Sequence, residues 1–420
     1  NPQELRGTKT GVFVGCSASE TGGALTQDPE TVTGYTLTGC VRSMFSNRLS
    51  FAFDLRGPSF SVDTACSSSM CAFQLAIDAM RQDQCDAAIV AGAHLTLTPT
   101  AALQFLRLGM LSDKGSCRSF DESGDGYCRT EGVAAILLQR APNAKRIYAT
   151  VVHAKSNTDG YKEQGITFPS GERQAALLEE VYREANVDPN QVTYVETHGT
   201  GTKVGDPQEA NAICEVFCSN RPLDNPLLIG SVKSNMGHAE PASGLCSVAK
   251  VLLAMERGEI PPNLHYNEPN PYIPGLSDGR LKVVSERTPF KGGFVGINSF
   301  GFGGSNTHIL LKAADHKVKE ITEKPTIPKL LLYSGRTQES VKSIFKYVED
   351  HKENEYFHGL LYNQANINPK DTPCRGFMLF NREGTDDNIV DVQKIPITES
   401  RPVWFIYSGM GSQWPGMGKG

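Results

Sequence analysis

Cys66 combines the residue type and the local setting of a catalytic nucleophile. Residues 59–63 predict a short buried strand, and residues 67–81 predict a helix with an apolar face, so Cys66 falls at the helix N-terminus. Unpaired backbone N–H groups and the positive end of the helix dipole favour a thiolate over a thiol there. We therefore expect the pKa of Cys66 to lie below the free value of about 8.5. The alternative is a buried, inert cysteine, which is common in protein cores.

Two histidines stand in comparable settings. His198 follows a predicted strand in the glycine-rich segment at 196–202, and His238 ends the segment at 233–238, which follows another strand and precedes a predicted helix. Catalytic groups gather at the carboxyl ends of strands in α/β folds. His198 and His238 are therefore candidate catalytic residues alongside the Cys66 nucleophile. Surface or core roles are expected for histidines without such a context, namely His153, His316, His351 and His358.

Composition excludes several classes of protein. The 420 residues carry a net charge of −5, and Lys and Arg form no cluster dense enough to predict a nucleic-acid surface. No apolar run approaches the ~20 residues of a membrane span, and the first residues lack the features of a signal peptide. Eleven cysteines at irregular intervals predict free thiols in a reducing compartment, which we take to be the cytoplasm. The closest pairs, Cys66/Cys71 and Cys214/Cys218, have no second pair at zinc-site spacing, so no metal is expected.

Short apolar strands alternate with helices up to about Lys312, which predicts an α/β fold. Asp206 is expected to cap one helix, because Pro207 suits the first helical position and Glu209 lies three residues after the cap. Further strands are predicted at 10–15, 87–92, 133–138, 192–196, 227–231, 294–298 and 308–311, and further helices at 172–185 and 242–256. For the chemistry above, these elements must bring Cys66 and both histidines together.

The composition changes after about Ala313. Lys and Glu become frequent at 315–329, and two prolines interrupt this segment, which predicts a linker. Residues 330–333 and 340–349 then predict a strand and a helix of a small α/β domain, and residues 401–407 predict a strand that opens a further domain. Because the chain begins and ends abruptly, we expect it to be a piece of a longer protein.

Four short motifs occur in an order and spacing that are specific to one enzyme family. They are Asp-Thr-Ala-Cys-Ser-Ser-Ser at 63–69, Glu-Thr-His-Gly-Thr-Gly-Thr at 196–202, Lys-Ser-Asn-Met-Gly-His at 233–238 and Asn-Ser-Phe-Gly-Phe-Gly-Gly-Ser-Asn at 298–306. Together they resemble the β-ketoacyl synthases of the condensing-enzyme, or thiolase-like, family. The resemblance implies a layered αβαβα fold, here without the family's front segment.

The rest of the chain extends the resemblance. Residues 408–418 resemble the opening of a malonyl/acyl transferase, while 105–111 and 238–244 look like animal type I fatty acid synthases. The nucleophile and the histidine of such a transferase would follow Gly420, so acyl transfer by a serine is not expected of this chain. The order of motifs implies a ketosynthase at 1–312, a small α/β linker domain at 313–400 and the first strand of an acyltransferase at 401–420.

The resemblance implies a decarboxylative Claisen condensation between two acyl thioesters. Cys66 would carry the acyl chain, and N–H groups of His198 and His238 would hold the enolate that remains when a malonyl unit loses carbon dioxide. Lys233 would organise the histidines, with a surface amine as the alternative. The oxyanion that forms at the Cys66 acyl group would be held by the backbone N–H groups of Cys66 and Phe302.

Further implied roles concern the substrate. Thr200 and Thr202 would contact the phosphopantetheine arm, although simple turn hydroxyls are the alternative. Phe300 and Phe302 would gate the acyl channel, although core packing is the alternative. Three glycines of the last motif would let the backbone approach the substrate closely and adopt a positive φ, namely Gly301, Gly303 and Gly304.

The implied partners follow from the same resemblance. No cofactor is expected on this region itself, because 4′-phosphopantetheine would belong to a partner acyl carrier protein. Malonyl and acyl thioesters of CoA or of the carrier protein would be the substrates. An adjoining acyltransferase domain and a second copy of the chain, paired through the central sheet, complete the set, with no nucleic acid and no membrane.

Three alternatives remain open. The glycines at 199–205 follow a strand and precede a helix, as in a dinucleotide-binding fingerprint, although the third glycine falls one position late. A non-catalytic condensing-enzyme-like scaffold is disfavoured by the presence of Cys66 and both histidines. An animal polyketide synthase with malonyl or methylmalonyl extenders shares the chemistry, and the ketosynthase motifs do not separate it from a fatty acid synthase.

Overall fold

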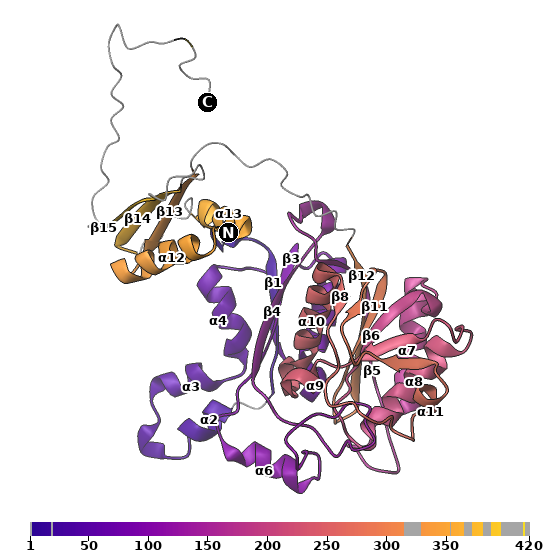
Figure 1. Ribbon diagram of the computed structural model, residues 1–420. Helices are drawn as coiled ribbons and strands as arrows, with labels where there is room; N and C mark the ends of the chain where they lie inside the picture. Colours follow the sequence, from indigo (N-terminus) through magenta and orange to yellow (C-terminus); the bar gives the residue numbers. More distant parts are fainter. Residues whose placement is uncertain are drawn as a thin grey trace. The chain divides into compact units, whose positions relative to one another are not determined.

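Figure 1 shows the computed structural model, which describes residues 2–17, 20–314, 329–352, 354–364, 372–380, 388–395 and Pro415. The chain forms two compact units, residues 2–317 and residues 318–420. Nearly all of the linker expected at 315–329 lies outside the described residues, and so does the strand expected at 401–407.

The first sheet of the larger unit has the strand order β2-β1-β3-β4. β1 pairs in parallel with β2 and β3, and β4 is antiparallel to β3. Every residue of β1 is buried, as is typical of a strand covered on both faces. The strands predicted in this region are confirmed with small shifts at their ends. The burial expected for the strand at 59–63 is wrong, because no residue of β2 is buried and Phe60 is 52 % exposed. Their bounds are Thr10–Gly15 (β1), Ser59–Val62 (β2), Ala87–His94 (β3) and Gly132–Gln139 (β4).

The second sheet has the order β5-β12-β11-β6-β7-β9. β11, β6, β7 and β9 run parallel, whereas β12 is antiparallel to both of its neighbours. The carboxyl ends of β6, β7 and β11 therefore lie at the same edge of the sheet. The loops that carry the last three sequence motifs start there. The predicted strands are confirmed, and β5 and β9 are additional. The bounds are Ala149–Thr158 (β5), Val192–Glu196 (β6), Leu227–Gly230 (β7), Leu281–Val283 (β9), Phe294–Phe300 (β11) and Ser305–Ala313 (β12).

Helices separate the two sheets and cover their outer faces. α5 (Ser68–Arg81) and α10 (Ser243–Arg257) pack between the sheets and share one apolar core with strands of both. α4 (Ser43–Phe53) covers the outer face of the first sheet, while α7 (Gly171–Ala185) and α8 (Gly205–Cys218) cover the outer face of the second (Figure 1). The larger unit is therefore layered α/β/α/β/α, as the resemblance implies.

Short elements connect these layers. Helices α1, α2, α3, α6, α9 and α11 span Pro2–Leu5, Glu20–Leu25, Gly34–Cys40, Pro99–Arg107, Lys233–Met236 and Pro274–Ser277. 3₁₀ turns span Pro29–Thr31, Ala65–Ser67, Ala141–Asn143, Pro189–Gln191 and Glu240–Ala242. A two-stranded antiparallel pair consists of β8 (Glu259–Ile260) and β10 (Thr288–Pro289).

The smaller unit contains an antiparallel sheet in the order β13-β14-β15. Val341 and Phe345 of α12 share an apolar core with Met378 of β14. The strand predicted at 330–333 and the helix predicted at 340–349 are confirmed. The bounds are Lys329–Gly335 (β13), Gln338–Asp350 (α12), Glu355–Gln364 (α13), Cys374–Phe380 (β14) and Ile389–Lys394 (β15).

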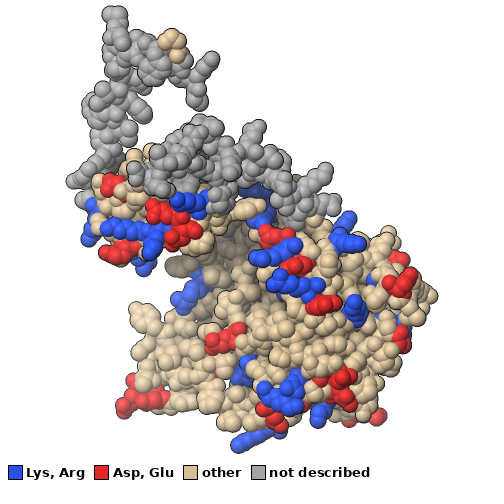
Figure 2. Space-filling model, in the orientation of Figure 1, with Lys and Arg blue, Asp and Glu red and all other residues tan. Residues whose placement is uncertain are grey.

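Side chains of both charge signs are interspersed on the face shown in Figure 2. None of the described helices is both long enough and apolar enough to cross a membrane. All eleven cysteines lie in the described part of the chain, and each carries a free thiol.

Candidate active site

A sharp turn of the backbone presents Cys66 just after the end of β2. Ala65 has a φ of +56°, in the left-handed region, and opens the 3₁₀ turn that leads directly into α5. The Cys66 carbonyl oxygen accepts hydrogen bonds from Ser299 Oγ of β11 at 3.0 Å and from Ser243 Oγ of α10 at 3.4 Å. Elements that are far apart in the sequence therefore fix the backbone of Cys66.

The loop between β11 and β12 approaches this turn closely. A Cβ on Gly301 would lie 2.5 Å from the carbonyl oxygen of Thr64, so a larger residue would displace one of the two backbones. Gly304 has a φ of +91°, whereas Gly301 and Gly303 have no positive φ, and a Cβ on Gly303 would meet nothing within 4 Å. The expected positive φ is thus wrong for Gly301 and Gly303. Position 301 requires glycine only because the two backbones approach closely. At position 303 neither a close approach nor a positive φ requires glycine.

The surroundings of Cys66 disfavour the thiolate. Burial raises the pKa of Cys66 to about 12, and the negative charge of Glu240 acts in the same direction. The charge of Lys233 and the backbone N–H groups of Phe302 and Cys66 lower the pKa, but they do not compensate. The expected pKa below the free value is therefore wrong, because loss of water around the sulfur outweighs the helix N-terminus. The two N–H groups that reach the sulfur are those that the resemblance assigns to the oxyanion hole.

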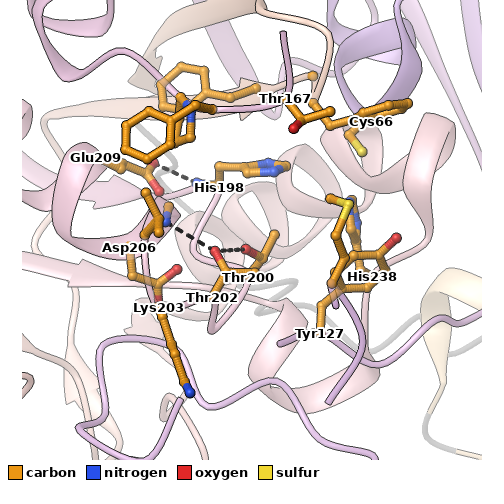
Figure 3. Close-up of a pocket in the computed structure, with 18 of the residues that line it drawn as sticks. Cys66, Tyr127, Thr167, His198, Thr200, Thr202, Lys203, Asp206, Glu209 and His238 are labelled. Carbon is orange, nitrogen blue, oxygen red and sulfur yellow. Dashed lines mark hydrogen bonds between the residues drawn. The ribbon is translucent and has the colours of Figure 1, made fainter. Parts of the chain in front are cut away.

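His198 and His238 lie side by side in the structure. Their ring centroids are 5.3 Å apart, and the rings are nearly perpendicular, at 85°. His198 follows β6 and His238 follows β7, so two adjacent parallel strands bring the histidines together. Phe300 packs against His198 with 5.9 Å between centroids, and Tyr127 meets His238 edge-on at 5.0 Å. Figure 3 shows both imidazoles and the Cys66 thiol around one space.

The surroundings of each imidazole favour its neutral form and leave one buried nitrogen without a hydrogen-bond partner among the described residues. His238 Nδ1 accepts a hydrogen bond from the Glu240 backbone N–H at 3.3 Å, so the hydrogen of the neutral ring is on Nε2. Within the described residues, neither His238 Nε2 nor His198 Nδ1 has a hydrogen-bond partner, although both atoms are buried. Burial, and then the charge of Lys233, lowers the pKa of each histidine well below its ordinary value.

Lys233 lies in the interior, with only 1 % of its surface exposed. The alternative of a surface amine is therefore wrong. Burial lowers the pKa of Lys233, while the negative charges of Glu196 and Glu209 raise it. Lys233 does not line the cavity described below, so it acts on the histidines through its charge rather than through the reacting atoms.

A buried carboxylate holds the loop that carries His198. Glu209 of α8 accepts the backbone N–H of His198 at 2.7 Å and that of Gly199 at 2.8 Å. Asn298 Nδ2 donates to the same carboxylate at 2.9 Å, and His308 Nδ1 lies 2.6 Å from the Asn298 side-chain oxygen. The backbone of His198 is thus tied to a network that extends into the core.

A second buried carboxylate holds the same loop further along. α8 begins at Gly205, so the expectation that Asp206 caps this helix is wrong. Its carboxylate instead accepts the N–H of Gly201 at 3.0 Å and that of Phe120 at 2.8 Å, because buried loop amides need an acceptor. Thr202 Oγ1 accepts the N–H of Gly205 at 3.2 Å. The amides that a dinucleotide fingerprint would turn toward a phosphate are therefore already used, at positions 199, 201 and 205.

A cavity of about 420 Å³ joins these groups (Figure 3). Thr200 and Thr202 line it with hydroxyls 3.2 Å apart. Phe302 is 36 % exposed and meets the Phe105 ring edge-on, whereas Phe300 is buried. The sequence-predicted residues that line the cavity are Cys66, His198, Thr200, Thr202, His238, Phe300, Gly301 and Phe302, and those that do not are Lys233, Gly303 and Gly304.

Several lining residues were not predicted from the sequence. Gln174 of α7 is 2 % exposed, and its side-chain oxygen has no partner within the described residues. The sequence feature that could have identified Gln174 is its position on the apolar face of the predicted helix, four residues before Leu178, where a polar residue is unexpected. The other residues lie in loops without a periodic pattern or inside a helix, and they include Tyr127, Thr167, Lys203, Asp206 and Glu209.

The side chains around the cavity offer a thiol, two imidazoles, hydroxyls and amides. Within the described residues, no group of three His, Cys, Asp or Glu side chains could hold a metal ion. The arrangement supplies a nucleophile and neutral N–H donors for negative charge on oxygen.

Comparisons with known proteins agree with this geometry. Residues 1–144 match the family "Beta-ketoacyl synthase, N-terminal domain", residues 148–267 match its C-terminal domain, and residues 269–379 match the ketoacyl-synthetase C-terminal extension. The chain is 57 % identical over 258 residues to the fatty acid synthase of the goose Anser anser anser, an alignment that covers 61 % of this chain and 73 % of that protein. It is 37 % identical over 442 residues to one of the phenolphthiocerol/phthiocerol polyketide synthase proteins of Mycobacterium tuberculosis, which covers 100 % of this chain but only 23 % of that protein.

Solved ketosynthase structures have the same fold. The oxazolomycin ketosynthase domain of Streptomyces albus matches with a TM-score of 0.81 at 28 % identity, covering 93 % of this chain and 72 % of that one. The ketosynthase from module 6 of the bacillaene synthase of Bacillus subtilis matches with a TM-score of 0.79 at 30 % identity, covering 91 % and 66 %. The layered architecture is therefore the thiolase-like ketosynthase fold, and the chain belongs to the β-ketoacyl synthase family of condensing enzymes, which form carbon–carbon bonds.

Proposed function

We propose that this chain joins an acyl group on Cys66 to a malonyl unit on an acyl carrier protein, in the biosynthesis of fatty acids. One observation supports this assignment above the others. Cys66, His198 and His238 come from separate motifs, yet they line one cavity, and both imidazoles are neutral with a buried nitrogen that has no partner among the described residues.

In the first step, the Cys66 sulfur attacks the carbonyl carbon of an acyl thioester. The thiol of the incoming carrier leaves, and the proton lost by Cys66 balances the proton that the leaving thiolate takes up. Because the pKa of Cys66 is raised to about 12, the free enzyme holds a thiol at neutral pH, and the reaction draws on a small thiolate fraction. The N–H groups of Cys66 and Phe302 hold the oxyanion of the tetrahedral intermediate.

In the second step, the malonyl thioester loses carbon dioxide, and the electron pair of the broken bond forms an enolate. His198 and His238 donate N–H to the enolate oxygen, and as neutral groups they need no proton from solution. The enolate carbon then attacks the acyl carbon on Cys66, and the Cys66 thiolate leaves. The product is a β-ketoacyl thioester on the carrier.

The cavity lining suits an amide-bearing arm such as 4′-phosphopantetheine. The hydroxyls of Thr200 and Thr202 and the buried oxygen of Gln174 offer hydrogen bonds to its amides. Phe302, partly exposed at the lining, and Phe300 beside His198 would gate the acyl chain.

The resemblance also supports a wider arrangement. The chain would comprise a ketosynthase at 1–312, a linker domain at 313–400 and the start of an acyltransferase at 401–420, in a cytoplasmic multifunctional enzyme. Free thiols throughout agree with a reducing compartment. A second copy would pair along β2, which is the end strand of the first sheet within the described residues.

Two substitutions separate the proposed steps. Cys66→Ala should abolish chain elongation but leave decarboxylation of malonyl thioester measurable, because the enolate site is intact. His238→Ala should slow decarboxylation by about a hundredfold or more. His153→Ala is the matched control, since His153 pairs with Glu184 at 2.8 Å outside the cavity. Equal loss of both activities in Cys66→Ala, or an unchanged decarboxylation rate in His238→Ala, would contradict the division of labour.

A polyketide synthase is the second candidate, because the mycobacterial polyketide synthase aligns with the whole of this chain. Both candidates use the same ketosynthase chemistry. Product analysis of the full-length protein supplied with malonyl-CoA or methylmalonyl-CoA separates them: a saturated unbranched chain supports the fatty acid synthase, and a branched or unreduced product supports the alternative.

A further inference from the structure

The segment around Arg129 runs parallel to the segment of His238, and the two residues form an isolated β-bridge. The carbonyl oxygen of Cys128 accepts the His238 backbone N–H at 2.7 Å, and the Thr130 N–H donates to the His238 carbonyl oxygen at 3.1 Å. The approach is close, because a Cβ on Gly237 would lie 3.0 Å from the Cys128 oxygen. The backbone on either side of Arg129 therefore holds the backbone of His238.

The side chain of Arg129 reaches a second residue next to His238. Arg129 Nε donates to Glu240 Oε1 at 2.6 Å, and Nη2 donates to Oε2 at 3.2 Å, which is a two-pronged pairing. Glu240 has a φ of +42°, in the left-handed region that residues with a Cβ rarely adopt. In this conformation its backbone N–H meets His238 Nδ1 at 3.3 Å.

The pair is buried within a wider charged cluster. Arg129 Nη2 also donates to Glu20 Oε1 at 3.3 Å, and the other oxygen of Glu20 accepts the Leu97 N–H at 2.7 Å. His94 Nε2 lies 3.4 Å from Glu240 Oε2, and the Arg129 side chain is only 7 % exposed. Removing one member of such a cluster leaves a buried charge unpaired, so the geometry of Glu240 depends on Arg129.

Two contacts connect this cluster to the active site. One is the Glu240 N–H on His238, and the other is Tyr127, which lies beside His238 in Figure 3. The Tyr127 hydroxyl lies 3.5 Å from Glu240 Oε1, and its ring meets His238 edge-on. Arg129 itself does not line the cavity.

We propose that Arg129 is a positioning residue for His238. By binding the Glu240 carboxylate, Arg129 keeps the Glu240 backbone in its left-handed conformation. The Glu240 N–H then stays hydrogen-bonded to His238 Nδ1. The neutral imidazole is thereby fixed as the tautomer with its hydrogen on Nε2, which has no partner within the described residues and is free to meet the enolate oxygen. This inference rests on the proposed function only for the identity of that oxygen.

The first test compares decarboxylation of malonyl thioester in Arg129→Met and in the unaltered chain. We expect kcat to fall by about tenfold to a hundredfold, with KM changed by less than about twofold, because a mispositioned donor weakens the transition state. Arg129→Lys keeps the positive charge but cannot form the two-pronged pairing with Glu240. Its kcat should therefore lie between those of the unaltered chain and Arg129→Met. Arg140→Met is the matched control, because Arg140 pairs with the exposed side chain of Asp83 outside the site.

A double variant distinguishes positioning from general stability. Glycine adopts a left-handed φ without strain and keeps the backbone N–H, so Arg129→Met with Glu240→Gly should recover most of the lost rate. If Arg129 only supported the fold, the kcat of the folded fraction would not fall in Arg129→Met, and Glu240→Gly would restore only the stability by removing the unpaired charge. An Arg129→Met variant as fast as the unaltered chain, or a double variant no faster than Arg129→Met, would overturn the proposal.

A spectroscopic readout keeps the test independent of activity. ¹⁵N NMR of histidine-labelled chain, with the His238 signal assigned by its loss in His238→Gln, should give a single tautomer protonated on Nε2. Arg129→Met should give a mixture of tautomers, and the double variant should restore the single form. An unaltered chain without decarboxylase activity would overturn the proposed function, whereas a His238 protonated on Nδ1 would overturn the role of Arg129.

Discussion

Opposing electrostatic effects act on the Cys66 thiol. Loss of water and the charge of Glu240 raise the pKa, while the charge of Lys233 and two backbone N–H groups lower it. The two histidines are kept neutral by the same dehydration and by Lys233, so no imidazolium stands beside the sulfur to stabilise a thiolate. The site therefore stabilises negative charge on substrate oxygens rather than on the Cys66 sulfur.

The raised pKa predicts the pH dependence of Cys66 alkylation. Only the thiolate reacts with iodoacetamide, so the rate should rise about tenfold for each pH unit between about pH 7 and about pH 10. Free cysteine measured in parallel should level off above its pKa of about 8.5. The rate is read from the modified Cys66 peptide by mass spectrometry, and a plateau for Cys66 below about pH 9 would contradict the raised pKa.

Residue types and local spacing were sufficient to select Cys66, His198 and His238 as candidates. The pKa of Cys66 could not be predicted in the same way, because its main determinants are burial and a charge at Glu240, which is remote in the sequence. Burial of Lys233 was likewise expected only from the small and apolar character of its motif. Local sequence indicates which groups can react, while distant residues determine their protonation.

At the scale of elements, the turn between β11 and β12 offers a matched pair of substitutions. Gly301→Ala would place a Cβ 2.5 Å from the Thr64 carbonyl oxygen, whereas Gly303→Ala would meet nothing within 4 Å. We expect Gly301→Ala to lower the free energy of unfolding by about 1–3 kcal/mol, the usual cost of forcing an atom into a packed region. Gly303→Ala should stay within about 0.5 kcal/mol of the unaltered chain.

The same pair should differ in activity. Displacement of Gly301 moves the neighbouring Phe302 N–H away from the Cys66 acyl group, so condensation should slow by at least about tenfold. Chemical denaturation gives the stability, and a condensation assay at saturating thioester gives the rate. If Gly301→Ala and Gly303→Ala behaved alike in both measurements, the close approach of the two loops would not matter for the oxyanion hole.

Most helices and strands could be predicted from the sequence, because apolar periodicity and strand-like runs depend on local residues. The start of α8 could not. Asp206 and Glu209 fit a capping pattern, but their carboxylates bind loop amides of Phe120, Gly199 and Gly201 instead. A cap and a tertiary anchor use the same side-chain chemistry, so the sequence alone does not distinguish them.

At the scale of the whole molecule, strand order is the part that local reasoning could not supply. β1 lies between β2 and β3, and β5 joins the sheet formed by strands that follow it in the chain. Such pairing depends on contacts between remote segments. The layered fold was therefore expected from the resemblance of four motifs, and not from periodicity.

In the proposed dimer, two copies would join along the edge of β2 that is unpaired among the described residues. Pro58 and Val62 turn their carbonyl oxygens toward β1, so alternation leaves the N–H and C=O of Ser61 facing away from the sheet. Ser61→Pro removes that N–H, and proline is tolerated on an edge strand. We expect the variant to shift from a dimer to a monomer of 45.6 kDa in light scattering after size exclusion.

Ser61→Ala is the control for this prediction, because it removes the hydroxyl that donates to the Arg42 carbonyl at 2.7 Å but keeps the backbone N–H. It should remain a dimer. Alkylation of Cys66 in Ser61→Pro checks that the neighbouring site is intact. A Ser61→Pro variant that remains fully dimeric would show that pairing does not use this strand.

Ala65 contributes no reacting atom, yet its left-handed backbone determines where the adjacent sulfur lies. Branched side chains such as valine and isoleucine resist that conformation, whereas glycine and asparagine accept it. The backbone conformation alone therefore limits which residues can occupy position 65, in nature or in a randomised library. A variant of this sequence therefore needs a suitable residue at position 65 to keep the Cys66 thiol functional. Chemical modification of the active site would not identify this residue, because Ala65 has no reactive side chain.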